Sequence, residues 1–511
     1  MDTPDLDRRP NILIIMSDDQ GLWAMGCAGT PELLTPTLDR LAAEGTRFSN
    51  FFCASPVCSP ARASFLTGRI PSQHGVHDWI KSGNIDVEDG VTWCGRDRPI
   101  EYLQGLTGFT DVLAANGYRC GLSGKWHLGA SGTPQKGHSY WCAHSLGGDS
   151  YTDYFIFDND TELTRQSHYV TDLFTDRAID CLDQWGNGEE PFCLSVHYTA
   201  PHAPWRQGEQ PPEIWQLYDE GEFGSLPVLP PHPWGGWDPT PQQRREVIQG
   251  YFTTISAMDA GIGRLLDRLD TLGIADNTLV FFTSDNGYNL GHHGVNGKGN
   301  GTHPLNMFEE SVKVPFIARC SGRFPAGVVN EDLLSHYDFL PTILDYVGIE
   351  NPIEGALPGR SFAHVLKGEE GDCGHEAVVV CDEYGPVRMV REREWKYVHR
   401  YPDGPHELYC LAEDPSEMVN LVNDAQQTGR VTDMRNRLDH WFSQYSDPAW
   451  DEALEAVSGK GQTGLTSFEG RCGGATQRSC QRRLWSANSL GYKGVARSAA
   501  VSAQAVTGKI P

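Results

Sequence analysis

The stretch of the chain with the most chemical content is residues 58–69, whose sequence is Cys-Ser-Pro-Ala-Arg-Ala-Ser-Phe-Leu-Thr-Gly-Arg. Cys58 stands four residues before Arg62, with Pro60 between them. A cysteine taken alone is most often a small buried side chain, and here it would mark the start of a helix. The alternative is a reactive group beside the planar, permanently charged fork of Arg62. The polar motifs elsewhere in the chain decide between these two interpretations.

Acidic side chains follow two predicted strands that are far apart in the chain. Asp18 and Asp19 follow the first apolar run, and Asp285 and Asn286 follow the strand predicted at residues 277–284. Because sites gather at the carboxyl ends of strands in open α/β sheets, the two loops can bring these groups together. Like charges packed closely need a cation, and oxygen ligands suit Ca²⁺, with Mg²⁺ as the alternative, rather than Zn²⁺. Taken separately, each motif could be a helix cap or a turn.

Further candidates are a lysine and two histidines. Lys125 and His127 follow the strand predicted at residues 118–123, and on an extended segment residues two apart point to the same face. This pattern suits a cation that touches an oxygen of an anionic group beside a proton acceptor. His202 lies in Ala-Pro-His-Ala-Pro, where the two prolines restrict the backbone around it. The alternative for all three is a solvated lysine with structural histidines, which is also what we expect of His197.

Lys298 lies between two glycines, downstream of Asp285. Glycines let the backbone approach a ligand closely, so Lys298 can reach a bound anion; the alternative is a solvated lysine on a flexible loop. His292 and His293 could be zinc ligands, but no cysteine or histidine cluster accompanies them. We expect these two histidines to line the pocket or to orient their neighbours.

Together, these motifs resemble the type I sulfatase family. The resemblance rests on the twelve residues from Cys58, on the Gly-Lys-x-His motif at residues 124–127, and on a Glu-Leu-Tyr and Asp-Pro-x-Glu pattern near residues 407–417. It extends over roughly residues 9–450. In this family the cysteine is oxidised by a maturation enzyme to formylglycine, an aldehyde whose hydrate attacks sulfur. That match favours the functional interpretation of Cys58.

The resemblance also implies roles for individual residues. It implies a metal site formed by Asp18, Asp19, Cys58, Asp285 and Asn286. It implies catalytic roles for Cys58, Arg62, Lys125, His127, His202 and Lys298. In this assignment His127 is the proton acceptor, and His202 contacts the sulfate group or the leaving oxygen.

Two features depart from the usual sequence of the family. Lys313 stands in a Lys-Val-Pro segment where an arginine is usual. The spacer between Lys298 and Asn306 is longer than in many members, which bears on the role of Lys298 as the second sulfate-binding lysine.

Strand and helix patterns alternate over residues 1–370. Apolar runs predict strands at residues 10–16, 118–123, 191–198 and 277–284. Helical spacing of apolar residues predicts helices at residues 35–44, 101–116, 171–185 and 248–272. Near-continuous apolar runs are typical of parallel strands buried on both faces. We therefore predict an α/β catalytic domain with a large mixed, mostly parallel sheet and helices on both faces, which is alkaline-phosphatase-like according to the resemblance.

The sequence pattern and the composition change towards the end of the chain. Short strands and one helix over residues 371–455 predict a small α+β subdomain with an antiparallel sheet. Residues 456–511 contain eight Lys or Arg against one acidic residue, together with many Gly, Ser and Ala. This composition predicts a flexible basic tail.

The composition excludes some partners. A net charge of −26 over 511 residues argues against nucleic acid, and it requires a local positive site if the substrate is an anion. The longest apolar runs fall short of the ~18 residues that a membrane span needs. The first ten residues lack the apolar core of a signal peptide, so we expect a cytoplasmic protein, with export as the alternative. The oligomeric state has no signal in the sequence.

These observations predict a sulfuric ester hydrolase that cleaves a small-molecule or saccharide sulfate ester. The tryptophan-rich stretch at residues 203–245 and the segment at residues 77–81 offer stacking surfaces of the kind found in sugar pockets. Carbohydrate and aryl sulfates are therefore the expected substrates, with choline sulfate as another candidate. One alternative is a phosphonate monoester or phosphodiester hydrolase of the same superfamily. The other, if Cys58 is never oxidised, is a non-catalytic protein that binds sulfated glycans.

Overall fold

The computed structural model describes residues 9–86, 98–159, 163–369, 371, 374–383, 385–448, 450–451 and 461–466. Among the helices in these ranges, none combines the length and the apolar composition that crossing a bilayer requires.

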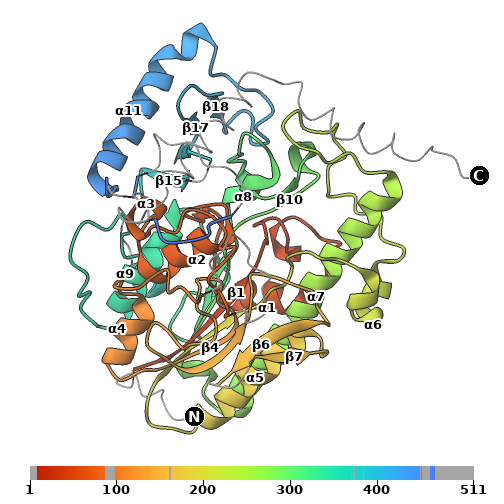
Figure 1. The fold of residues 1–511 in the computed structure, drawn as a ribbon, viewed down its shortest axis with the longest axis vertical. Helices are drawn as coiled ribbons and strands as arrows, with labels where there is room; N and C mark the ends of the chain where they lie inside the picture. The colour runs from red at the N-terminus through yellow and green to blue at the C-terminus, as the bar shows by residue number, and fades with distance from the viewer. Residues whose placement is uncertain are drawn as a thin grey trace, which may run out of the picture.

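A ten-stranded sheet in the order β13-β2-β12-β9-β1-β8-β4-β5-β6-β7 forms the centre of the molecule (Figure 1). Its strands are β1 (Asn11–Ser17), β2 (Thr46–Phe48), β4 (Arg119–Lys125), β5 (His138–His144), β6 (Tyr154–Asp158), β7 (Thr164–Gln166), β8 (Phe192–His197), β9 (Thr278–Ser284), β12 (Phe316–Arg319) and β13 (Val328–Asn330). The central strands β9, β1, β8, β4 and β5 are parallel, whereas β12, β6 and β7 pair antiparallel with their neighbours. The predicted mixed, mostly parallel sheet is confirmed.

Helices cover both faces of this sheet, as predicted. The long helices α1 (Pro36–Glu44), α5 (Val170–Trp185) and α7 (Pro241–Thr271) pack on one face. Helices α2 (Cys58–Thr67), α4 (Phe109–Ala115) and α9 (Phe339–Tyr346) pack on the other. Side chains of β1 alternate between the two layers, so Leu13 and Ile15 enter one core while Ile12 and Ile14 enter the other. Apolar residues at successive positions of β1 are thereby explained.

Short elements connect these layers. They are β3 (Phe51–Phe52), α3 (Pro71–His74), α6 (Pro212–Trp215), β10 (Asn289–Leu290), β11 (Asn296–Gly297), α8 (Glu309–Val312), β14 (Leu334–Ser335) and α10 (Ala363–Leu366).

Two helices differ from the predicted boundaries. The helix predicted at residues 101–116 begins only at Phe109, because Gly105 adopts a φ of +78° that interrupts a helix before it. Helix α7 begins at Pro241 rather than at residue 248. Its first turn is fixed by Thr240, whose hydroxyl accepts a hydrogen bond from the backbone N–H of Gln243 at 3.2 Å. The predicted excursion at residues 203–245 therefore ends inside a helix.

A four-stranded antiparallel sheet follows the main sheet in the chain. Its strands are β15 (Ala377–Asp382), β16 (Val387–Glu392), β17 (Trp395–Arg400) and β18 (Glu407–Cys410). Helix α11 (Thr428–Tyr445) packs on it through Met434, Leu438 and Phe442. This is the predicted α+β fold, while the exact domain boundaries stay a prediction. Of the predicted tail, residues 461–466 are described and lie against residues 75–82; its other residues lie outside the described ranges.

A buried ion-pair cluster joins β17 to the main domain. The Lys396 ammonium is fully buried, 2.6 Å from a carboxylate oxygen of Glu417 and 3.2 Å from one of Glu309. Burial raises the pKa of Glu417 to about 7 despite the lysine charge. For Glu309, burial acts in the same direction, but Lys396 and Arg391 outweigh it and lower the pKa to about 2. The lysine thus compensates the buried carboxylate of Glu417 and shares the charge of the partly buried Glu309 with Arg391 and Lys313.

Replacing Lys396 with Met is expected to destabilise the fold by about 3–5 kcal/mol, because it leaves the buried carboxylate of Glu417 without its counter-ion. Urea unfolding followed by circular dichroism measures this loss. The matched control is Arg435→Met, since Arg435 lies on the surface 3.8 Å from Asp439 and should cost less than ~1 kcal/mol. Equal effects of the two substitutions would contradict the role of the cluster.

Candidate active site

The two acidic loops meet because their strands are neighbours in the sheet. Ser17 of β1 is paired with Ser284 of β9, so the residues that follow each strand emerge side by side. The backbone N–H of Asp19 donates to Oδ1 of Asp285 at 3.2 Å. Asp18, Asp19 and Asp285 are buried, and one oxygen of each lies within 4.8 Å of the others. The structure thus brings together the carboxylates that the sequence predicted to meet.

Asn286 completes this cluster. Its Nδ2 donates to Oδ1 of Asp19 at 2.8 Å and to the carbonyl oxygen of Gly287 at 2.9 Å. Its Oδ1 is buried and has no hydrogen-bond partner among the described residues. A buried acceptor without a donor is costly, and a cation beside the three carboxylates would satisfy it. The donor set consists of hard oxygen atoms, so these residues fit a hard divalent ion.

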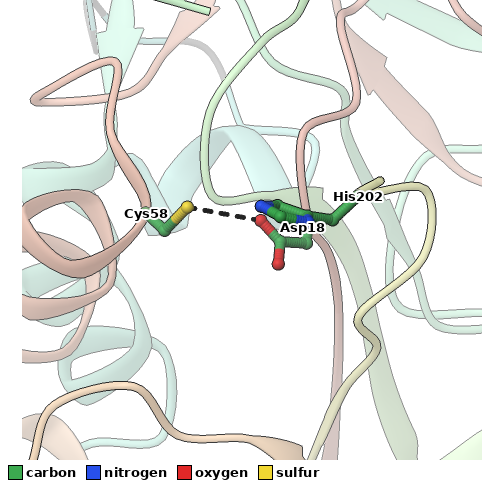
Figure 2. A group of neighbouring side chains, drawn as sticks. All are labelled: Asp18, Cys58 and His202. Atoms are coloured by element: carbon green, nitrogen blue, oxygen red, sulfur yellow. Dashed lines mark hydrogen bonds between the residues drawn. The ribbon is translucent and has the colours of Figure 1, made fainter. Parts of the chain in front are cut away.

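Cys58 opens helix α2 and faces the carboxylates, as Figure 2 shows with Asp18 and His202. Its Sγ lies 3.5 Å from Oδ1 of Asp18 and 2.6 Å from Nζ of Lys298. Burial, and then the charge of Asp18, raises the pKa of the Cys58 thiol to about 12. Cys58 is therefore both the start of a helix and a member of the polar cluster, and as an unmodified thiol it is a weak nucleophile at neutral pH.

Three buried cations neutralise the carboxylates. Nε of Arg62 lies 2.9 Å from Oδ2 of Asp285, and its Nη1 donates to the carbonyl oxygen of Lys125 at 3.1 Å. The Lys125 ammonium forms an ion pair with Oδ2 of Asp18. The Lys298 ammonium lies 2.5 Å from Oδ1 of Asp19. Despite the long spacer that follows it, Lys298 is placed in the cluster.

His127 is held from one side only. Its Nε2 donates to the carbonyl oxygen of Ile80 at 3.0 Å, whereas its buried Nδ1 has no hydrogen-bond partner among the described residues. Burial, and then the charge of Lys125, keeps the pKa of His127 well below its usual value. A neutral imidazole whose Nε2 carries the proton has its lone pair on Nδ1. His127 can therefore accept a proton at Nδ1.

His202 lies at the opening of the cluster and is partly exposed. Its Nε2 is 3.7 Å from Oδ2 of Asp19, and its Nδ1 donates to the carbonyl oxygen of Ala203 at 2.6 Å. The hydroxyl of Tyr151 donates to the carbonyl oxygen of His202 at 2.8 Å. The loop is tied to the acidic cluster as well, since the N–H of Asp18 donates to the carbonyl oxygen of Ala200 at 2.9 Å.

Other histidines have structural surroundings. His293 stacks on Phe308 with ring centroids 3.7 Å apart and bonds to Glu310 at 3.0 Å. Although Glu417 is also close, its carboxylate is paired with Lys396, so this group offers no free ligand set.

The sequence interpretation did not identify the carbonyl of Ile80 as a partner of His127. A backbone carbonyl carries no signature in the sequence, so only the structure could show it.

Comparisons with known proteins identify the family of the chain. The model of the sulfatase family matches residues 10–349, and that of the C-terminal part of N-sulphoglucosamine sulphohydrolase matches residues 304–444. An N-acetylglucosamine-6-O-sulfatase of Bacteroides thetaiotaomicron is 28% identical over 537 residues, covering 90% of each chain.

Solved structures show the same fold. One, in complex with its substrate D-glucosamine-2-N,6-O-disulfate, has a TM-score of 0.70 at 24% identity and covers 87% of this chain and 100% of its own. The phosphonate monoester hydrolase of Agrobacterium radiobacter has a TM-score of 0.63 at 21% identity, and the match covers 86% of this chain and 96% of that hydrolase.

The chain therefore belongs to the sulfatase family of the alkaline phosphatase superfamily. It is an enzyme that hydrolyses sulfate esters, and the resemblance drawn from its motifs is confirmed. The family generally uses a metal ion and formylglycine.

Proposed function

We propose that the enzyme hydrolyses a saccharide sulfate monoester, with Ca²⁺ as its ion and formylglycine at position 58. The observation that carries this proposal is the contact of Cys58 with both Asp18 and Lys298, at 3.5 and 2.6 Å from Sγ. A nucleophile at this position would lie between the metal ligands and a sulfate-binding cation. The saccharide is supported by the relative that is an N-acetylglucosamine-6-O-sulfatase, and by the fold shared with a protein bound to a glucosamine disulfate.

The proposed ion would be held by the side chains of Asp18, Asp19, Asp285 and Asn286, together with position 58. Hard oxygen donors suit Ca²⁺ or Mg²⁺ rather than Zn²⁺. Ca²⁺ is proposed because the resemblance to the type I sulfatases implies it, and Mg²⁺ is the alternative. The ion supplies positive charge next to the sulfate, and formylglycine supplies, as its hydrate, the oxygen nucleophile.

The remaining roles fall to side chains of the chain itself. Lys125, Lys298 and Arg62 hold the oxygen atoms of the sulfate and the negative charge that develops on them. His127 accepts a proton at Nδ1, the nitrogen left without a partner. His202, at the opening of the cluster, lies where the leaving oxygen of the ester would be. These roles rest on the contacts of the cations with the acidic cluster, on the free Nδ1 of His127, and on the closeness of His202 to Cys58 and Asp18.

The charge balance explains how an acidic protein takes up an anion. The cluster contains three buried carboxylates and three buried cations, which cancel. A divalent ion leaves the site positive, inside a chain whose overall charge is −26. Attraction of the sulfate is therefore local, and it depends on the ion.

Replacing Lys298 with Ala is expected to lower kcat by ~10² to 10³, because one preorganised donor to the sulfate is lost. The initial rate with p-nitrophenyl sulfate measures this effect. The matched control is Lys367→Ala, an exposed lysine 5.6 Å from the ring of Tyr346, which should leave the rate unchanged. A Lys298 variant with the wild-type rate would remove this residue from the site.

The proposed function is tested by comparing ester classes on one preparation. We expect sulfated glucosamine and galactosamine derivatives, and p-nitrophenyl sulfate, to be hydrolysed faster than a phosphonate monoester. The fold shared with a phosphonate monoester hydrolase makes the reverse order the specific alternative. Turnover of aryl sulfates without turnover of any sulfated sugar would contradict the saccharide substrate, while the assignment as a sulfatase would stand.

A further inference from the structure

Residues 461–466, named here the C-terminal strap, pair with a loop of the main domain through a single β-bridge. Gln462 forms a parallel β-bridge with Ile80. Its backbone N–H donates to the carbonyl oxygen of Trp79 at 2.8 Å, and its carbonyl oxygen accepts from the N–H of Lys81 at 2.9 Å. A segment nearly 400 residues later in the chain therefore pairs with a loop that follows helix α3.

The side chain of Gln462 strengthens this attachment. It is buried, with 8% of its surface exposed. Its Oε1 accepts from the N–H of His77 at 2.8 Å, and its Nε2 donates to the carbonyl oxygen of Gly75 at 3.0 Å. The hydroxyl of Ser82 also donates to the carbonyl oxygen of Thr463 at 3.1 Å. One amide side chain thus satisfies backbone groups at two points of the loop, in addition to the β-bridge.

The same loop contacts the catalytic histidine on its other side. The carbonyl oxygen of Ile80 accepts from Nε2 of His127 at 3.0 Å, and the N–H of Ile80 donates to Oγ of Ser59 at 3.1 Å. The hydroxyl of Ser59, next to Cys58 in α2, donates to the carbonyl oxygen of His127 at 2.9 Å. Ile80 therefore lies between the strap and the pair formed by His127 and the first turn of α2.

We propose that the strap is a positioning element of the active site, and that Gln462 is a positioning residue which acts on His127 through Ile80. This inference rests on the proposed function. An acceptor that faces one ring nitrogen fixes the proton on that nitrogen and leaves the lone pair on the other. The carbonyl of Ile80 is that acceptor, and the strap fixes the backbone on both sides of it. With the loop released, Nδ1 of His127 would no longer be held at its place in the cluster.

The test uses the full chain with Gln462 replaced by Met, which keeps the length of the side chain and removes its polar atoms. Hydrogen exchange of the peptide covering residues 75–84 is expected to become faster. With p-nitrophenyl sulfate, kcat is expected to fall about 10- to 100-fold while KM changes less than about twofold, as a small displacement of a catalytic group predicts. The unfolding midpoint should stay near that of the wild type.

Two further variants make the comparison specific. Thr463→Ala is the matched control in the strap, because Thr463 contributes its backbone carbonyl, and it should behave as the wild type. Gln462→Glu keeps the acceptor for His77 but sets a buried carboxylate against the carbonyl oxygens of Gly75 and Gly464, so its kcat should fall at least as far as that of Gln462→Met. A normal rate in Thr463→Ala beside losses in both Gln462 variants separates the role of the buried amide from a general effect of changing the strap.

A crystal structure of Gln462→Met gives a readout that does not depend on activity. We expect the separation between Ile80 and His127 Nε2 to exceed hydrogen-bonding range. An unchanged separation, unchanged exchange, or a loss confined to KM would each overturn the proposal. Inactivity of the wild-type enzyme on every sulfate ester would instead refute the proposed function, and the exchange and crystallographic results would still decide whether the strap holds His127.

Discussion

Replacing Cys58 with Ala is expected to lower kcat for sulfate esters by about six orders of magnitude, or to the detection limit, because it removes the precursor of the nucleophile. Structural disturbance should be small, since the side chain loses a single atom at the start of α2. The rate with p-nitrophenyl sulfate and mass spectrometry of the peptide covering residues 54–62 are the two measurements. The wild-type peptide should carry an aldehyde in place of the thiol.

The control for this experiment is a second buried cysteine. Cys53 lies close by in the sequence, but its Sγ contacts only the carbonyl oxygen of Ser311, at 3.8 Å, among the hydrogen bonds described for it. Cys53→Ala should therefore retain the wild-type rate. An intact Cys58 thiol in a fully active preparation would contradict the formylglycine assignment. An intact thiol in an inactive preparation would favour the alternative of a non-catalytic protein that binds sulfated glycans.

Replacing Asp285 with Ala is expected to abolish activity and to lower the content of bound ion. Oδ2 of Asp285 pairs with Arg62 at 2.9 Å, while its Oδ1 accepts from the backbone N–H groups of Asp19 and Asn286 at 3.2 and 2.8 Å. The substitution thus removes a proposed ligand, the counter-ion of a buried arginine, and the link between two loops. We expect at least a ~10³-fold loss in kcat, together with a lower unfolding midpoint.

Asp285→Asn distinguishes the loss of a metal ligand from the loss of fold stability, because an amide oxygen can still accept hydrogen bonds from both backbone N–H groups. This variant should unfold closer to the wild type but remain inactive. Ion content is measured by elemental analysis, and recovery of chelated wild-type enzyme is compared with Ca²⁺ and Mg²⁺. Asp267→Asn, at a carboxylate with 75% of its surface exposed, is the control and should retain both ion and activity. Full activity of Asp285→Ala would refute the metal site.

The sequence predicted the centre of the fold and the chemical groups of the site better than the details between them. Strands such as β1 and β9 were predictable because parallel strands buried on both faces have uninterrupted apolar runs. The site residues were predictable because they lie in short local motifs directly after these strands. The short edge strands β7 and β13 have weak patterns and were not predicted. The early start of α7 depends on the cap at Thr240, which hydrophobic spacing does not show.

Contacts that use the backbone could not be predicted at all. The carbonyl of Ile80 is specified by the path of its loop, and that path depends on Gln462 near the other end of the chain. The composition of the tail predicted only flexibility, since it has few large aliphatic residues. The hydrogen bonds of one buried amide side chain hold residues 461–466 in place although the composition around them predicts flexibility. Composition counts residue types, so it cannot show such a contact.

The burial of α2 has a consequence for the order of events during synthesis. Every residue of this helix is buried, and Phe65 stacks on Phe339 of α9 with ring centroids 4.3 Å apart. The segment that carries Cys58 leaves the ribosome long before α9 exists to cover it, by roughly 14–54 s at ordinary elongation rates. If Cys58 is oxidised as proposed, the oxidising enzyme would have to reach it before the chain folds around α2, because every residue of this helix is buried in the folded chain. The yield of active enzyme would then depend on the rate of that oxidation relative to the synthesis and folding of the next 270 or so residues.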